Sequence, residues 1–160
     1  MLRKQILTEW PVSTGLPAGE KEIAAIATVW VTSETVDHPI DRAFDSSRGP
    51  GGSRWVAAEP GEQRLMLVFD APQTLRTIIV EVEEPEVSRT QELQIGISLD
   101  DGKTFQELRR QEYTFSPPGT TFEREEWAIT TTGVTHLYLV IIPDKGGRPG
   151  RATLTTLSLR

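Results

Sequence analysis

Short stretches in which apolar and polar residues alternate recur along the second half of the chain. In residues 77–83, Ile78, Val80 and Val82 fall on one side of an extended chain and polar residues on the other. This period of two is typical of a half-buried strand. Residues 92–99 repeat the pattern, so a second strand is predicted there. The residues of this strand that we expect to face inward are Leu93, Ile95, Ile97 and Leu99.

A hairpin is predicted directly after residues 92–99. The segment Asp100-Asp101-Gly102-Lys103 places Asp and Gly where a tight turn needs residues that tolerate positive φ. Residues 104–108 would then return as the next strand.

Three further segments complete the predicted strands. Residues 65–69 are continuously apolar, as in a buried strand, and residues 136–142 are apolar on both faces, as in a central one. In residues 153–159, Leu154 and Leu157 fall on opposite faces under simple alternation, so the segment has a bulge or is partly helical. We expect the bulge, because the three Thr of this segment are poor helix formers. Many short strands joined by Gly, Pro and Asp predict an all-β, antiparallel β-sandwich.

The beginning of the chain is less regular. Pro and Gly residues cluster there, which predicts a leader over residues 1–20 and one domain over residues 21–160. Residues 21–31 combine helical spacing with strand-forming residues, and we expect their second half to be a strand.

Composition narrows the class of protein. None of the 160 residues is Cys, which excludes thiol nucleophiles and disulfides. Only two are His, which excludes a histidine-rich metal centre. The net charge of -6 would repel the negatively charged backbone of a nucleic acid, so we expect no nucleic-acid partner. No segment approaches the ~20 apolar residues of a membrane span, and no signal peptide is evident. We expect a cytoplasmic protein, although a domain excised from a secreted parent would look the same.

A series of segments, in chain order, resembles a known family. They are ATVWVTSE at residues 27–34, AFD at 43–45 followed by SRW at 53–55, LVFDAPQTL at 67–75, ISLDDGKTF at 97–105 and HLYLVI at 136–141. Together they resemble the discoidin, or coagulation factor 5/8 type C, family of galactose-binding-domain-like proteins, which includes many bacterial carbohydrate-binding modules. The resemblance implies an eight-stranded jelly roll with ligand-binding loops at one end.

The resemblance also implies which residues bind a sugar. Glu34 matches the family's carboxylate and Arg89 its arginine. The family's histidine is missing after the Trp, and His38, beside Asp37, could replace it from another loop. The alternative interpretation makes these residues solvated loop charges or an ordinary surface ion pair.

A structural calcium is the one cofactor that the resemblance suggests. Asp45 and Ser53 match two of its ligands, but the last strand offers Thr155 or Thr156 where the family has a glutamate. Calcium needs several anionic oxygens, so this loss would weaken the site. The alternative is a metal-free loop capped by Asp45.

Other residues have simpler predicted roles. The sequence contains no nucleophile elbow, and we interpret the acidic clusters at residues 81–86 and 123–126 as solvated. We therefore expect that the protein is not an enzyme. Trp55 is expected in the core, Trp30 on an outer contact surface, and His136 packed in its strand. Arg148 and Arg151 are interpreted as exposed loop residues, with anion binding as the alternative.

These observations favour a non-catalytic module that binds carbohydrate through loops at one end. The alternative is an intracellular protein-protein interaction module of the same fold. Sugar binding predicts a concave, polar loop cluster with an exposed ring beside it, whereas protein binding predicts a flatter apolar patch.

Overall fold

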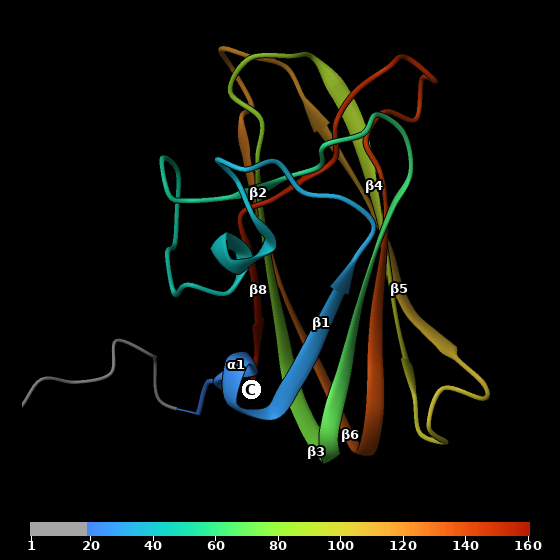
Figure 1. Cartoon of the computed structure of the whole chain (residues 1–160). Helices are drawn as coiled ribbons and strands as arrows, with labels where there is room; N and C mark the ends of the chain where they lie inside the picture. Colours follow the sequence, from blue (N-terminus) through green and yellow to red (C-terminus); the bar gives the residue numbers. More distant parts are fainter. Residues whose placement is uncertain (1–18) are drawn as a thin grey trace, which may run out of the picture.

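The structure, a computed structural model, describes residues 19–160. It is built almost entirely of antiparallel strands (Figure 1). In chain order the elements are α1 (Ile23–Ile26), β1 (Ala27–Val31), the 3₁₀ helix η1 (Ile40–Ala43), β2 (Trp55–Val56), β3 (Gln63–Glu83), β4 (Arg89–Ser98), β5 (Gln106–Phe115), β6 (Phe122–Ile142), β7 (Thr153–Leu154) and β8 (Thr156–Leu159). The predicted all-β antiparallel sandwich is confirmed.

Two long strands connect the layers of this sandwich. β3 and β6, of 21 residues each, pair along their length, but the register shifts between Val68 and Thr77. In one layer, residues 63–68 of β3 lie between β1 and residues 136–141 of β6, followed by β4 and β5. We call this the five-stranded layer. In the three-stranded layer, β3 pairs on one side with β8 and on the other with the first half of β6.

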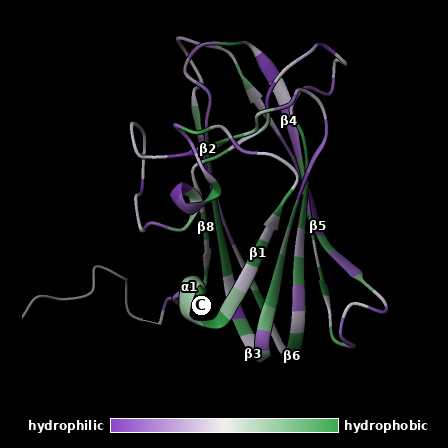
Figure 2. Cartoon of the chain, in the orientation of Figure 1, coloured by the Kyte–Doolittle hydropathy of each residue, from purple (hydrophilic) through white to green (hydrophobic). Residues whose placement is uncertain are grey.

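The core lies between the two layers. Alternate residues are buried in the first part of β3 and the last part of β6, whereas residues 78–82 of β3 are buried on both faces. Figure 2 shows hydrophobic and hydrophilic positions interspersed along the ribbon. The predicted inward residues Ile78, Val80 and Val82 of β3 are at most 1% exposed. Leu93, Ile95 and Ile97 of β4 are buried in the same way.

The predicted hairpin is present, with one error at its start. Asp101 and Gly102 have φ angles of 60° and 82°, as the turn requires. Leu99, predicted to face inward, is 52% exposed, because β4 ends at Ser98 and Leu99 already belongs to the turn.

The end of the chain changes its partner by a break in the strand, where a bulge was predicted. Thr155 interrupts the strand, so that β7 pairs with β2 and β8 pairs with β3. Leu154 and Leu157 are both buried as a result. The helical turn α1 and strand β1 likewise confirm the expectation for residues 21–31.

One prediction about acidic residues is wrong. Glu81 was interpreted as solvated but is 3% exposed. The glycine-rich loop before β2 covers the carboxylates of β3: Gly49 N donates to Glu81 Oε1 at 3.3 Å, and Gly51 N donates to Glu83 Oε2 at 2.8 Å. Backbone N–H groups of this loop therefore replace water around these carboxylates.

The tryptophans divide as expected between core and surface. Trp55 is 1% exposed and its Nε1 donates to Ser33 O at 3.0 Å, whereas Trp30 is 65% exposed. Trp10 and most of the predicted leader lie outside the described residues. Within residues 19–160, no helix is long and apolar enough to cross a membrane.

Candidate functional site

Three connections meet at one end of the sandwich, opposite the β4–β5 hairpin (Figure 1). They are the β3–β4 connection, the β6–β7 connection and the segment leading into β2. Between them lies a cavity of about 380 Å³, which we call the loop-end cleft. Its charged lining residues are Arg54, Glu83, Glu84, Glu86, Arg89, Asp144, Arg148 and Arg151.

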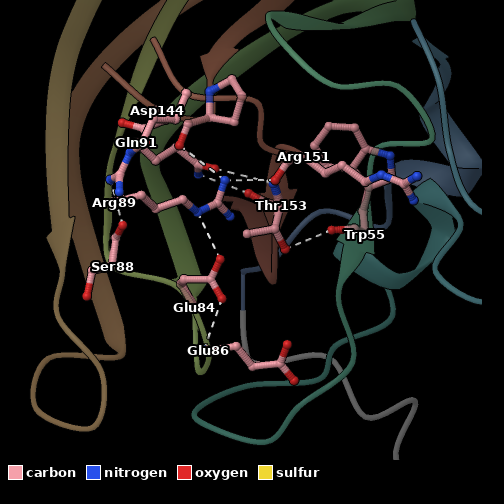
Figure 3. A network of polar contacts seen from close by, with 11 residues as sticks. Trp55, Glu84, Glu86, Ser88, Arg89, Gln91, Asp144, Arg151 and Thr153 are labelled. Atoms are coloured by element: carbon pink, nitrogen blue, oxygen red, sulfur yellow. Dashed lines mark hydrogen bonds and ion pairs between the residues drawn. The ribbon is translucent and has the colours of Figure 1, made fainter. Parts of the chain in front are cut away.

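Arg89, at the start of β4, holds the β3–β4 and β6–β7 connections together (Figure 3). Its Nε lies 2.9 Å from Glu84 Oε1, and its Nη1 donates to Pro143 O at 3.1 Å and to Arg151 O at 2.8 Å. Burial lowers the pKa of the Arg89 guanidinium, against the opposing effect of Glu84. Arg89 is 6% exposed, so these contacts fix it as part of the cleft wall.

The interior of this end is tied together by a second polar network (Figure 3). Gln91 Nε2 donates to Thr153 O at 3.1 Å, and Thr153 N donates back to Gln91 Oε1 at 3.3 Å. Thr153 Oγ1 also donates to Trp55 O at 3.0 Å. The network links β4, β7 and β2, and gives the cleft a rigid base.

Arg148 closes one side of the cleft. Its Nε donates to Asp144 Oδ2 at 2.9 Å and its Nη2 to Ser88 O at 2.8 Å. The backbone N–H of Gly146 and then Arg148 lower the pKa of the Asp144 carboxyl. This carboxylate is therefore kept charged and bonded within its own loop.

Two arginines of the cleft are available to a ligand. Neither Arg54 nor Arg151 forms an ion pair with any residue in the described part of the chain. Arg54 is half-buried and Arg151 is exposed. Val56, Val87 and Pro149 add apolar surface, and none of the described lining residues is aromatic.

The four predicted ligand-binding residues are not gathered in one place. Arg89 lines the cleft, whereas Glu34, Asp37 and His38 are not among its described lining residues. Glu34 Oε2 accepts a hydrogen bond from Ile40 N at 2.7 Å, which holds the first residue of η1. Asp37 is exposed and His38 half-buried.

The loop that carries these three residues nevertheless borders the cleft. His38 O accepts a hydrogen bond from Val56 N at 3.1 Å, and Thr35 N donates to Val56 O at 3.0 Å. Val56 itself lines the cleft. A binding role for Glu34, Asp37 and His38 stays a prediction.

Sequence reasoning missed Glu84 and Asp144 as parts of the site. Glu84 was grouped with the solvated acidic residues. The only sequence signal for its ion pair with Arg89 was that the two residues are close in the chain. Arg148 and Arg151 were noticed as a basic pair, yet nothing in the sequence indicated that Arg148 contacts Asp144 and Ser88.

The two predicted calcium ligands lie together in the loop before β2. Ser53 Oγ donates to Asp45 Oδ2, and Ser47 N donates to Asp45 Oδ1 at 3.0 Å. From the last strand, Thr156 Oγ1 donates to Ser47 O at 2.9 Å. Both carboxylate oxygens of Asp45 thus accept hydrogen bonds from within the loop, as the metal-free alternative predicts.

These residues do not fit a calcium ion well. Calcium takes six to eight oxygens, several of them anionic, and only Asp45 of the predicted pair carries a charge. Among residues 19–160, no group of three or more acidic or histidine side chains is placed to bind a metal. We assign no metal to this loop.

Comparisons with known proteins agree on the fold. No protein-family model and no curated protein sequence matches the chain. Module CBM32-3 of a family 31 glycoside hydrolase from Clostridium perfringens superposes with a TM-score of 0.64 at 15% identity, over 88% of this chain and 93% of that one.

Two further solved structures are similar. The family 32 carbohydrate-binding module of Clostridium perfringens NanJ, solved with galactose, gives a TM-score of 0.58 at 14% identity over 88% of this chain and 96% of that one. A pectin-binding module gives 0.60 at 21% identity over 84% and 90%. The chain thus has the fold of family 32 carbohydrate-binding modules, which confirms the fold that the discoidin resemblance implied.

Proposed function

We propose that the protein is a non-catalytic module that binds carbohydrate in the loop-end cleft. The observation that carries this proposal is the position of Arg89, buried and held by Glu84 and two backbone carbonyls in the wall of a concave, polar cleft. The cleft volume of about 380 Å³ lies within the roughly 300–1,000 Å³ of small-molecule sites.

The chemistry of the cleft suits a ligand rich in hydroxyl groups. Arg54 and Arg151 would donate hydrogen bonds, and the exposed carboxylate of Glu86 would accept them. A hydroxyl both donates and accepts, so it can use both kinds of group. Val56 and Val87 would contact the apolar C–H groups of a sugar ring.

In this proposal Arg89 is a positioning residue. Its guanidinium bonds to Pro143 O and Arg151 O hold the β6–β7 connection against β4. Arg151 then projects from a fixed backbone, which lowers the entropy lost when a ligand binds. The loop with Glu34, Asp37 and His38 would form the outer border of the site.

The experiment is affinity electrophoresis in native gels that contain a polysaccharide. Galactan, polygalacturonate and chitosan are the probes, because solved structures of this fold bind galactose, pectin and chitosan. The test variant is the double substitution Arg54→Ala and Arg151→Ala. The matched control is Arg76→Ala, an exposed arginine whose backbone bonds Arg160 at the other end of the molecule.

We expect galactan or polygalacturonate to retard the wild-type protein. The double variant should lose affinity about tenfold or more, because each arginine supplies charge-assisted hydrogen bonds. Arg76→Ala should behave as wild type. Equal retardation of the wild-type protein and the double variant would contradict binding in the cleft.

A further inference from the structure

The outer face of the five-stranded layer carries a row of apolar residues that crosses the strands. Trp30 of β1 pairs with Met66 of β3, Met66 with Tyr138 of β6, and Tyr138 with Gly96 of β4. Paired residues of neighbouring strands share a face. Their chain neighbours, such as Leu65, are buried in the core, so this row faces away from it.

Aromatic rings form much of this row. The ring of Phe105, from the β4–β5 hairpin, meets Tyr138 edge to face, with centroids 5.5 Å apart and an interplanar angle of 76°. Phe105 is 44% exposed and Trp30 is 65% exposed. Gly96 has no side chain, which leaves room for the Tyr138 ring. Between Trp30 and Phe105 lies a cavity of about 520 Å³, which we call the sheet-face groove.

A polar row runs beside the aromatic one. It consists of Arg64, Val140, Gln94 and Arg110, paired in that order across β3, β6, β4 and β5. Arg64 Nη2 lies 3.2 Å from Glu62 Oε2 and Arg110 Nε lies 3.0 Å from Glu107 Oε1, and all four side chains are at least 42% exposed. Gln94 donates its Nε2 to a neighbouring carboxylate, which leaves Oε1 as an acceptor. The row offers donors and acceptors, and the charge of each of its two arginines is balanced by the neighbouring glutamate.

This combination fits the surface of a sugar. A pyranose ring has an apolar face of C–H groups, which stacks on aromatic rings, and a rim of hydroxyls, which donate and accept hydrogen bonds. Trp30 and Tyr138 are two strand spacings apart, roughly 10 Å. We propose that the sheet-face groove is a second binding site, for an uncharged polysaccharide chain laid across the strands with sugar rings on Trp30 and Tyr138.

The charges of this face favour such a ligand over other occupants. A protein partner would cover the Arg64–Glu62 and Arg110–Glu107 pairs, and burying a paired charge costs more than its attraction usually returns. A second copy of this chain, with a net charge of -6, would also be repelled. An uncharged chain with hydroxyl groups leaves both ion pairs hydrated at the rim.

This inference rests on the proposed carbohydrate binding, but it concerns a different face and can fail separately. The test is affinity electrophoresis with galactan as the neutral probe. Trp30→Ala and Tyr138→Ala remove the rings, while Trp30→Phe and Tyr138→Phe keep a ring as matched controls. The double variant Arg54→Ala and Arg151→Ala reports on the loop-end cleft.

We expect each alanine variant of the groove to lose galactan affinity about tenfold, as for a lost stacking platform, and each Phe control to keep most of it. Loss in the groove variants alone supports the groove and contradicts the cleft. Loss in the cleft variant alone overturns the groove and leaves the proposed function standing. Loss in both sets supports two sites.

Two further results would overturn the inference. If galactan does not retard the wild-type protein, the groove does not bind this uncharged chain. If sedimentation shows a wild-type dimer that Trp30→Ala makes monomeric, the face is a self-association surface.

Discussion

The ring of Tyr138 lies directly over Gly96 of the neighbouring strand: a methyl group on Gly96 would come within 2.3 Å of Tyr138 Cε1. The glycine therefore sets where the ring sits on the outer face. No positive φ is involved, and the constraint is one of space alone.

The Gly96→Ala substitution should displace the Tyr138 ring. Because the ring is the end of a flexible, half-buried side chain, the free energy of unfolding should fall by only about 1 kcal/mol, measured by urea denaturation. In a Tyr138→Ala background the same substitution should cost nothing. An equal loss in both backgrounds would show that contact with the ring is not the cause.

Truncation of two tryptophans should change the stability of the protein by very different amounts. Trp55 is 1% exposed in the core, so Trp55→Ala should cost about 3–5 kcal/mol of unfolding free energy, measured in urea. Trp30 is 65% exposed, and Trp30→Ala should change stability by less than about 0.5 kcal/mol. A large loss from Trp30→Ala would contradict its place on the surface.

The Arg89–Glu84 pair should contribute to folding through its burial. Glu84→Gln removes the carboxylate that pairs with the buried Arg89 guanidinium and should cost roughly 3 kcal/mol in urea unfolding. Glu107→Gln is the matched control, because it breaks the exposed pair with Arg110 and should cost less than about 1 kcal/mol. Equal costs would contradict the burial of Arg89.

The β4–β5 hairpin should resist acid because of Asp100. Hydrogen bonds from the side chain and backbone of Thr104 and from Ser98 lower the pKa of Asp100 from 3.8 to about 2. Since the folded pKa is lowered, its stabilising effect is present above the ordinary pKa and is lost as the pH falls toward about 2.

An NMR titration of the Asp100 carboxyl measures this directly. The midpoint should lie near pH 2 in the wild-type protein and move upward in Thr104→Val, which removes the hydroxyl donor. A wild-type midpoint at the ordinary value of 3.8 would contradict these hydrogen bonds.

Much of the fold could be predicted because alternation reports directly on which face of a strand is buried. Ile78, Ile95 and their neighbours followed it closely. Leu99 did not, because periodicity alone does not indicate where a strand ends. Glu81 did not either, because its burial depends on a loop more than 30 residues away in the chain.

The candidate site was harder to predict. Arg89 was found through its place in a family motif, but its carbonyl partners lie 54 and 62 residues further along the chain. Such contacts depend on how long loops fold over one another. Glu34 matched its motif equally well, yet its carboxylate bonds within its own loop.

Backbone amide shifts of the ¹⁵N-labelled protein give the most direct test of carbohydrate binding at the loop end, during titration with an oligosaccharide of the polysaccharide, galactan or polygalacturonate, that retards the protein. The amides of Arg54, Val87 and Arg151 should move with saturation, while those of Arg76 and Gly133, which line neither the loop-end cleft nor the sheet-face groove, stay in place. Amides of the loop-end cleft that do not move would contradict the account.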